Sequence, residues 1–186
     1  MGSRDAKNEK AVGWASGAGK NASTGTFADA VKFGEVIVLA LSWTGVENAI
    51  QLAGVENFAG KVVIDAINPL TFGEKGPALA IGHTDSAGES VQRWLPSARV
   101  VKAFNIVGYA HMFKPDFPGG PPDMFICGND DPAKQTVTGI LNNFGWPAID
   151  IGGIEGSRLL EPLCILWVGY GIRTNTFNHA FKLLRK

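Results

Sequence analysis

The stretch Val36–Leu41, which reads Val-Ile-Val-Leu-Ala-Leu, decides the fold of this 186-residue chain. An unbroken apolar run of this length is typical of a strand that is covered on both faces, as in a parallel sheet between helices. Two similar runs follow, Val-Val-Ile at 62–64 and Val-Val-Lys-Ala-Phe at 100–104, and shorter ones lie at 124–127 and 147–150. The sequence therefore predicts a mainly parallel sheet.

Helix-start signals lie between these strands. A hydroxyl residue followed three positions later by an acid can satisfy the free amides of a first helical turn. The pattern occurs at Thr26 with Asp29, at Thr44 with Glu47 and at Ser86 with Glu89. Strands and helices thus alternate along the chain, which predicts an α/β, Rossmann-like doubly wound domain.

The last helix of this alternation is predicted at 131–144, with Pro132 in its first turn and Gly145 as its end. Residues 157–186 are apolar and aromatic, and we expect two helices there with a break near Tyr170–Gly171. We therefore divide the chain into a Rossmann-like domain at 1–155 and a helical C-terminal segment at 156–186.

Composition excludes several classes of protein. Hydrophobic residues make up 45% of the chain and charged residues 18%, as in a compact globular domain. Lys plus Arg and Asp plus Glu number 17 each, so no net charge favours nucleic acid or a membrane surface. Two cysteines, Cys127 and Cys164, are too few for a disulfide scaffold or a metal cluster. No signal peptide or membrane-spanning run is visible, and we expect a cytoplasmic protein.

The residues that follow each predicted strand are candidates for a ligand site, because ligands bind at the carboxyl ends of the strands in such sheets. They are Ser42 and Trp43 after the first run, 65–70 after the second and 105–108 after the third. Taken alone, each is typical of a loop that caps a backbone group. Three such turns at one sheet edge favour a ligand crevice.

Gly-Ser-Arg at positions 2–4 adds a further signal. In a dinucleotide-binding fold, the turn after the second strand meets the adenosine ribose. An acid there binds the 2′-hydroxyl, whereas a hydroxyl and an arginine accept a 2′-phosphate. Ser3 and Arg4 fit the phosphate, which predicts a preference for NADP(H) over NAD(H).

The chain resembles the NADP-dependent oxidoreductases related to the deazaflavin (coenzyme F420):NADP oxidoreductases of archaea and actinobacteria. It is also similar to the reductase domain of the six-transmembrane ferric reductases. Beyond the segments at 2–4 and 36–43, the resemblance rests on Lys-Val-Val-Ile-Asp-Ala-Ile-Asn-Pro-Leu at 61–70, Val-Val-Lys-Ala-Phe-Asn at 100–105, Cys-Gly-Asn-Asp at 127–130 and Ser-Arg-Leu-Leu-Glu-Pro-Leu at 157–163.

The resemblance implies hydride transfer between NADPH and a deazaflavin, a flavin or a similar acceptor. Because the two cofactors carry this chemistry, it implies no catalytic side chain and no metal. The positions that it implies for cofactor binding are Ser3, Arg4 and Lys7 at the 2′-phosphate, Leu41, Ser42 and Trp43 along the cofactor, and Asn68, Pro69 and Asn105 beside the nicotinamide and the second ring.

The family's opening strand, glycine-rich turn and helix have no counterpart in this sequence. No G-x-G-x-x-G motif opens the chain, and Gly17, Gly19 and Lys20 lack both the spacing of a phosphate loop and a strand before them. Since such a turn holds the pyrophosphate, we expect either a truncated chain or a weak nucleotide binder. A nucleotide-binding module without turnover and a partner-binding fragment are the alternative functions.

Several other residues are expected to have structural roles. His111, in the loop after Asn105, is either an ordinary loop residue or a contact to the acceptor. Glu161 is expected to form a cap, or a bridge within a dimer, rather than to catalyse. The segment from Leu159 to Phe181 has more apolar residues than a small sheet covers, which predicts a homodimer. The residues expected to pack in the core are Cys127, Cys164, Trp14, Trp94, Trp146 and Trp167.

Overall fold

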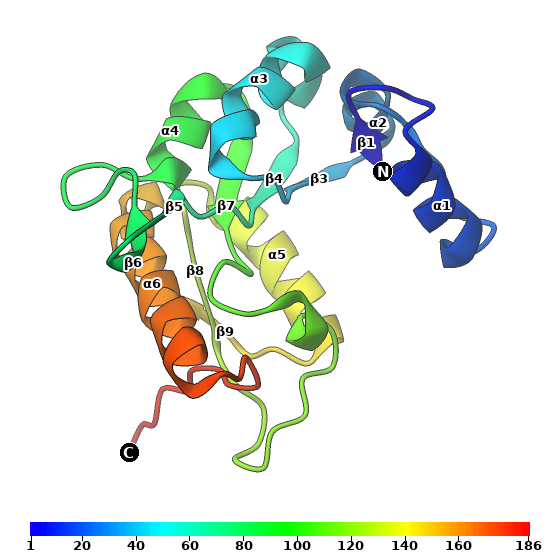
Figure 1. Ribbon diagram of the computed structural model, residues 1–186. Helices are drawn as coiled ribbons and strands as arrows, with labels where there is room; N and C mark the ends of the chain where they lie inside the picture. Colours follow the sequence, from blue (N-terminus) through cyan, green and yellow to red (C-terminus); the bar gives the residue numbers. More distant parts are fainter.

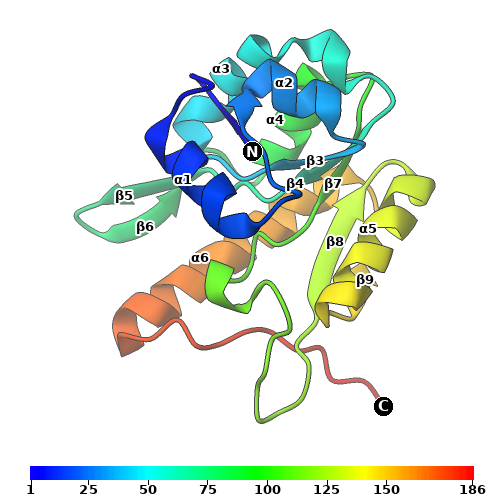
Figure 2. The ribbon, with the colours of Figure 1, turned by 90° about the vertical axis from the view of Figure 1, so that its right-hand side faces the viewer.

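The computed structural model covers residues 1–186 and has a sheet between two layers of helices (Figures 1 and 2). The central sheet has the strand order β3-β4-β7-β8-β9. Neighbouring strands are parallel except for the antiparallel pair β7 and β8, which confirms the mainly parallel sheet. The five strands are Val36–Leu39 (β3), Val62–Asp65 (β4), Arg99–Lys102 (β7), Met124–Gly128 (β8) and Ala148–Asp150 (β9).

Helices cover both faces of the sheet, as the unbroken apolar runs predict. Val63 and Val100 pack on one face with α2, α3 and α4, whereas Ile64 and Val101 pack on the other face with α5. Successive side chains of a strand point to opposite faces, so both faces need apolar residues. The helices of these two layers are Phe27–Phe33 (α2), Trp43–Ala53 (α3), Ala87–Trp94 (α4) and Asp131–Phe144 (α5).

Two of the three predicted helix starts are confirmed. Thr26 and Asp29 form a reciprocal capping box at α2, and Ser86 accepts a hydrogen bond from the amide of Glu89 at α4. The predicted start at Thr44 is wrong, since α3 begins at Trp43 after Ser42. The predicted bounds of α5 are confirmed, with Pro132 in the first turn and Gly145 in the left-handed conformation at the end.

The C-terminal segment contains one long helix, α6 (Ser157–Thr174), and the expected break near Tyr170–Gly171 is wrong. Gly171 is buried and serves packing instead, because a Cβ there would lie 2.4 Å from the Phe177 ring. The helix ends at Asn175, whose φ of 52° is left-handed. Residues beyond it contact the loop before β8, where Leu183 donates its amide to Asp123.

The first 26 residues form a unit of their own beside the central sheet (Figure 1). Strands β1 (Gly2–Ser3) and β2 (Gly25–Thr26) pair in parallel, and α1 (Glu9–Ala18) connects them. Strand β1 pairs only with β2, and β3 pairs only with β4. Between these two free edges lies an apolar groove of about 530 Å³, lined by Met1 and Gly2 on one side and by residues 36–41 on the other.

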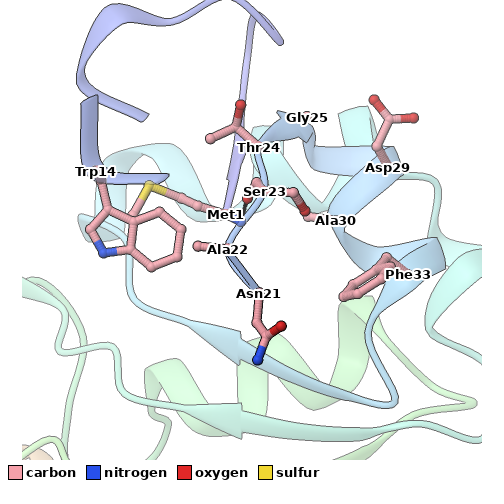
Figure 3. A pocket seen from close by; sticks show the side chains of 10 residues that line it. All are labelled: Met1, Trp14, Asn21, Ala22, Ser23, Thr24, Gly25, Asp29, Ala30 and Phe33. Carbon is pink, nitrogen blue, oxygen red and sulfur yellow. Dashed lines mark hydrogen bonds between the residues drawn. The ribbon is translucent and has the colours of Figure 1, made fainter. Parts of the chain in front are cut away.

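A second hollow, of about 460 Å³, lies beside Met1 at the amino ends of β1 and β2. Trp14 and Phe33 stand on opposite sides of it (Figure 3). Trp14 is 45% exposed, so its predicted packing in the core is wrong, because α1 has only one buried residue. Trp146, Trp167 and both cysteines are buried as predicted, and Trp94 packs against the core at its edge.

The remaining elements are short. A hairpin of β5 (Leu70–Gly73) and β6 (Gly76–Leu79) packs against α6 and was not apparent from the sequence. Three 3-10 helices span Val55–Phe58, Tyr109–His111 and Ile154–Gly156. None of the helices combines the length and apolar composition that crossing a membrane requires.

Candidate functional site

Asn68 and Asn105 follow β4 and β7, and hydrogen bonds join them at the carboxyl edge of the sheet. Asn68 Nδ2 donates to the Asn105 carbonyl at 2.7 Å, and Asn105 Nδ2 donates to Asn68 Oδ1 at 3.0 Å. Asn105 Nδ2 also donates to the carbonyl of Leu160 at 2.9 Å. Asn105 Oδ1 is buried without a partner, which leaves one free acceptor at this edge.

The backbone that presents Asn105 is strained. Phe104 has a φ of 63°, a conformation that a bulky residue rarely adopts. Its amide donates to Met124 Sδ at 3.3 Å, and its ring packs against Phe144. Strained residues of this kind persist where the surrounding packing over-determines them, and they gather at functional sites.

The three residues after β3 line the same edge in different ways. Leu41 packs against the core beneath it. Ser42 is exposed, and its side chain makes no cap hydrogen bond at the start of α3. Trp43 stacks on Trp94, with ring centroids 5.6 Å apart, so it is half-buried rather than free. The Ser42 hydroxyl is therefore the side-chain group in this turn that a ligand can reach.

Pro69 is buried. It directly follows Asn68 in the turn after β4 and directly precedes β5. Its carbonyl accepts a hydrogen bond from the amide of Ala80 at 2.7 Å. The structure places its ring inside the protein, so Pro69 shapes this turn rather than offering a surface.

Ser3, Arg4 and Lys7 lie together in the turn after β1, on the far side of the apolar groove from β3. The Ser3 hydroxyl donates to the Asp5 carbonyl, and the Lys7 amide donates to Asp5 Oδ1 at 2.9 Å. Arg4 is exposed and forms no ion pair, so its guanidinium is available to an anion. The structure thus assembles this cluster and the asparagine pair separately.

A buried ion network that the sequence interpretation missed lies directly beneath the asparagine pair. Lys102 Nζ is 2.8 Å from Asp65 Oδ2 and 3.1 Å from Glu161 Oε1, and all three side chains are at most 1% exposed. Lysine is almost never fully buried without a partner. The available signal was therefore the lysine inside the apolar run 100–104.

Glu161 caps the start of α4, and a cap was one of the two roles expected for it. Its carboxylate accepts hydrogen bonds from the amides of Ala87 and Gly88, both at 3.0 Å, at the start of α4. Burial raises the pKa of Glu161, although Lys102 and the two amides oppose that rise. Because the carboxylate is enclosed within one subunit, the expected bridge within a dimer is wrong.

His111 is the last residue of the short 3-10 helix in the connection after Asn105. Its Nε2 lies 3.2 Å from Asn178 Oδ1, and its ring packs against Phe117. No group of His, Cys, Asp or Glu side chains has the arrangement of a metal site.

Gly17, Gly19 and Lys20 lie at the end of α1 and in the turn after it. A helix rather than a strand precedes this turn, so it lacks the strand-to-helix geometry of a phosphate loop.

Comparison with known proteins identifies the family. Residues 2–69 match the sequence profile described as NADP oxidoreductase coenzyme F420-dependent. A crystal structure of a candidate F420-dependent NADP reductase from Arthrobacter sp. FB24 superimposes with a TM-score of 0.89 and 34% identity, over 99% of this chain and 87% of that one. The chain belongs to the family of coenzyme F420-dependent NADP oxidoreductases.

Two curated relatives of this family member are longer than it is. It is 34% identical over 148 residues to the F420-dependent NADP reductase of Methanocaldococcus jannaschii. The matched region covers 78% of this chain and 66% of that protein. It is 30% identical over 135 residues to the rat metalloreductase STEAP3. The matched region covers 73% of this chain and 26% of that protein.

Proposed function

We propose that this chain binds NADP(H) and supports hydride transfer between its nicotinamide and a deazaflavin such as coenzyme F420, or a flavin. The observation that carries the proposal is the edge where three strands end, with the exposed Ser42 hydroxyl and the paired Asn68 and Asn105. Two planar rings need alignment and shielding from water rather than acid–base help. This edge supplies fixed polar groups without a catalytic acid or base.

The residues present fit the two ends of a dinucleotide. Arg4, without an ion pair, and Ser3 with Lys7 form a set of donors suited to a 2′-phosphate. The unpartnered Asn105 Oδ1 is an acceptor of the kind that a carboxamide N–H satisfies. When bound, the nicotinamide would supply the hydride. The chain has no glycine-rich turn between a strand and a helix, so we assign no residue to the pyrophosphate.

An absorbance assay tests the transfer. NADPH is mixed with oxidised F420, or with FMN, in the absence of oxygen, and consumption of both partners is followed. We expect F420 to be reduced faster than FMN and one NADPH to be consumed per F420. Binding of NADPH without reduction of either acceptor would contradict the proposed reaction.

Cofactor preference tests the role of Arg4. We expect NADPH to bind more tightly than NADH, and Arg4→Asp to reduce that preference about 10- to 150-fold, since a charge-assisted contact is worth roughly 1.5–3 kcal/mol. Arg173→Asp, a change of the same charge far from β1, serves as the control. Equal affinities of the unchanged chain for the two cofactors in calorimetric titration would remove the basis for this role.

A nucleotide-binding module without turnover is the second candidate. The observation that favours it is the separation of the Ser3 cluster from the asparagine pair by an apolar groove. Such a module would show calorimetric binding of NADPH together with no change in its absorbance when F420 or FMN is added.

We also propose a cytoplasmic homodimer. Both cysteines are free thiols, the state that a reducing compartment maintains. One face of α6 exposes apolar side chains suited to a second copy of the chain, at Leu159, Leu166 and Tyr170.

A further inference from the structure

Three groups surround the buried ammonium of Lys102: two carboxylates and one backbone carbonyl. Besides Asp65 and Glu161, Lys102 Nζ has a third partner, the carbonyl of Ile67, to which it donates at 2.7 Å. A lysine ammonium has three N–H donors and no acceptor. The three partners come from β4, from the turn after β4 and from α6.

Stability alone does not account for this network. Removing an ammonium and two carboxylates from water costs several kcal/mol per ion, and well-packed apolar residues are often equally stable in such places. Buried ion pairs have been linked to conformational specificity in some proteins, which makes the geometry that they fix the relevant property.

Two of the three partners of Lys102 adjoin the asparagine pair: Ile67 is next to Asn68, and Glu161 is next to a residue that bonds to Asn105. Ile67, held by Lys102 through its carbonyl and by Asp65 Oδ1 through its amide at 2.9 Å, directly precedes Asn68. Leu160, whose carbonyl accepts from Asn105 Nδ2, directly precedes Glu161. Lys102 therefore connects to both members of the asparagine pair through the backbone.

We propose that Lys102 is a positioning residue, which holds the 65–69 turn and α6 so that Asn68 and Asn105 face the nicotinamide in a fixed orientation. The inference rests on the proposed function, because it takes the asparagine pair as the nicotinamide end of the site. Lys102 itself is fully buried and does not touch the cofactor.

The electrostatics favour the charged form of Lys102. Burial by itself would lower the pKa of Lys102, but Asp65 and Glu161 outweigh burial and raise the pKa above its usual 10.5. The ammonium is thus retained at every pH at which cofactor binding would be measured.

A charge-neutral variant of the same shape tests the proposal. Lys102→Met, Asp65→Asn and Glu161→Gln are combined, because removing Lys102 alone would leave two buried carboxylates and unfold the chain. The matched control carries Lys134→Met, Asp131→Asn and Asp150→Asn. Lys134 is a second lysine between two carboxylates, on α5 and β9, away from the asparagine pair.

The first measurement is hydrogen exchange. We expect the amide of Ile67 to exchange at least tenfold faster in the Lys102 variant than in the control, although the Asp65→Asn change retains an acceptor oxygen for that amide. The amide of Arg99, which bonds to the Lys61 carbonyl at the amino end of β7 and adjoins none of the changed residues, should be unchanged. Unchanged exchange at Ile67 would overturn the proposal.

The second measurement compares two ligands, NADPH and 2′,5′-ADP, which lacks the nicotinamide. We expect the Lys102 variant to bind NADPH at least tenfold more weakly and 2′,5′-ADP as well as the control does. Equal weakening of both ligands would show a general structural effect and overturn the positioning role. If the unchanged chain binds neither ligand, the proposed function fails, and the exchange of Ile67 then decides whether Lys102 fixes the turn.

Discussion

At the scale of single residues, Gly88 lies where α4 closely approaches α6. A Cβ on Gly88 would lie 2.1 Å from Ser157 Oγ and 3.0 Å from Lys102 Cε. We expect Gly88→Ala to destabilise the fold by about 1–3 kcal/mol, the usual cost of overpacking. Chemical denaturation measures the loss, and adding Ser157→Gly should recover part of it.

Gly139 supplies the control for that prediction. It lies exposed inside α5 with nothing within 4 Å of an added Cβ, and its backbone is helical. Gly139→Ala should therefore stabilise the chain by about 0.5–1 kcal/mol. Equal effects of the two glycine substitutions would contradict the close approach of α4 and α6.

The two thiols provide a prediction about pH. Burial raises the pKa of Cys127 to about 11 and that of Cys164 to about 12. A pKa that is higher in the folded state adds stability below the ordinary value of 9.0, and this stability is lost as the pH rises toward the raised values. We expect neither thiol to react with a disulfide reagent at about pH 8 until the chain is unfolded.

Unfolding free energies at several pH values complete that test. The double variant Cys127→Ala, Cys164→Ala should lose less stability than the unchanged chain between about pH 9 and pH 11. Rapid reaction of either thiol in the folded chain would contradict the burial of that thiol.

Residue-level roles were predictable where a local pattern decides them. Ser86 and Pro132 act at helix starts through neighbours three positions away or fewer, so the sequence shows them directly. The partners of Lys102 lie 35 and more positions away, and no spacing rule joins them. Long-range polar contacts of this kind depend on the folded geometry.

At the scale of elements, α6 has a stripe of exposed apolar residues. Leu159, Leu166 and Tyr170 are spaced to lie on one helix face, and Leu166 is 59% exposed. If this face meets a second copy, Leu166→Glu should convert a dimer into a monomer in light scattering at micromolar concentration. Leu52→Glu, at a similarly exposed position on α3, should leave the mass unchanged. A monomeric unchanged chain would rule out this interface.

Element ends were predictable to differing degrees. Gly145 ends α5 because its φ of 88° suits glycine, which the sequence signals. Gly171 was wrongly predicted to end a helix. The sequence alone does not distinguish a glycine that ends a helix from one that is required inside a helix because an aromatic ring, here Phe177, packs against it. The β5–β6 hairpin was missed because its two strands have four residues each and contain Gly73, Gly76 and Pro77, residue types that are depleted in strands.

At the scale of the whole molecule, the apolar runs predicted the layers and the sheet edge that carries Asn68 and Asn105. They did not predict how β3 is covered. Ile37 and Leu39 are buried on one face of β3, but Val38, on the opposite face, is 57% exposed, and β3 has a neighbouring strand on only one side. A run suited to a strand covered on both faces therefore borders an open groove.

The groove leads to a prediction about the whole chain. Fusing a strand, a glycine-rich turn and a helix in front of Met1 would place a strand between the free edges of β1 and β3, and would cover Val38. We expect the melting temperature to rise by about 2–4 °C for each kcal/mol gained. The new turn would supply amides for the pyrophosphate, so NADPH should bind at least about tenfold more tightly, or roughly 1.4 kcal/mol. A fusion with alanines in place of the turn glycines should gain stability but little affinity. If the fused and original chains melt at the same temperature and NADPH protects both equally, the groove does not accept a strand, and the cofactor is held by another route.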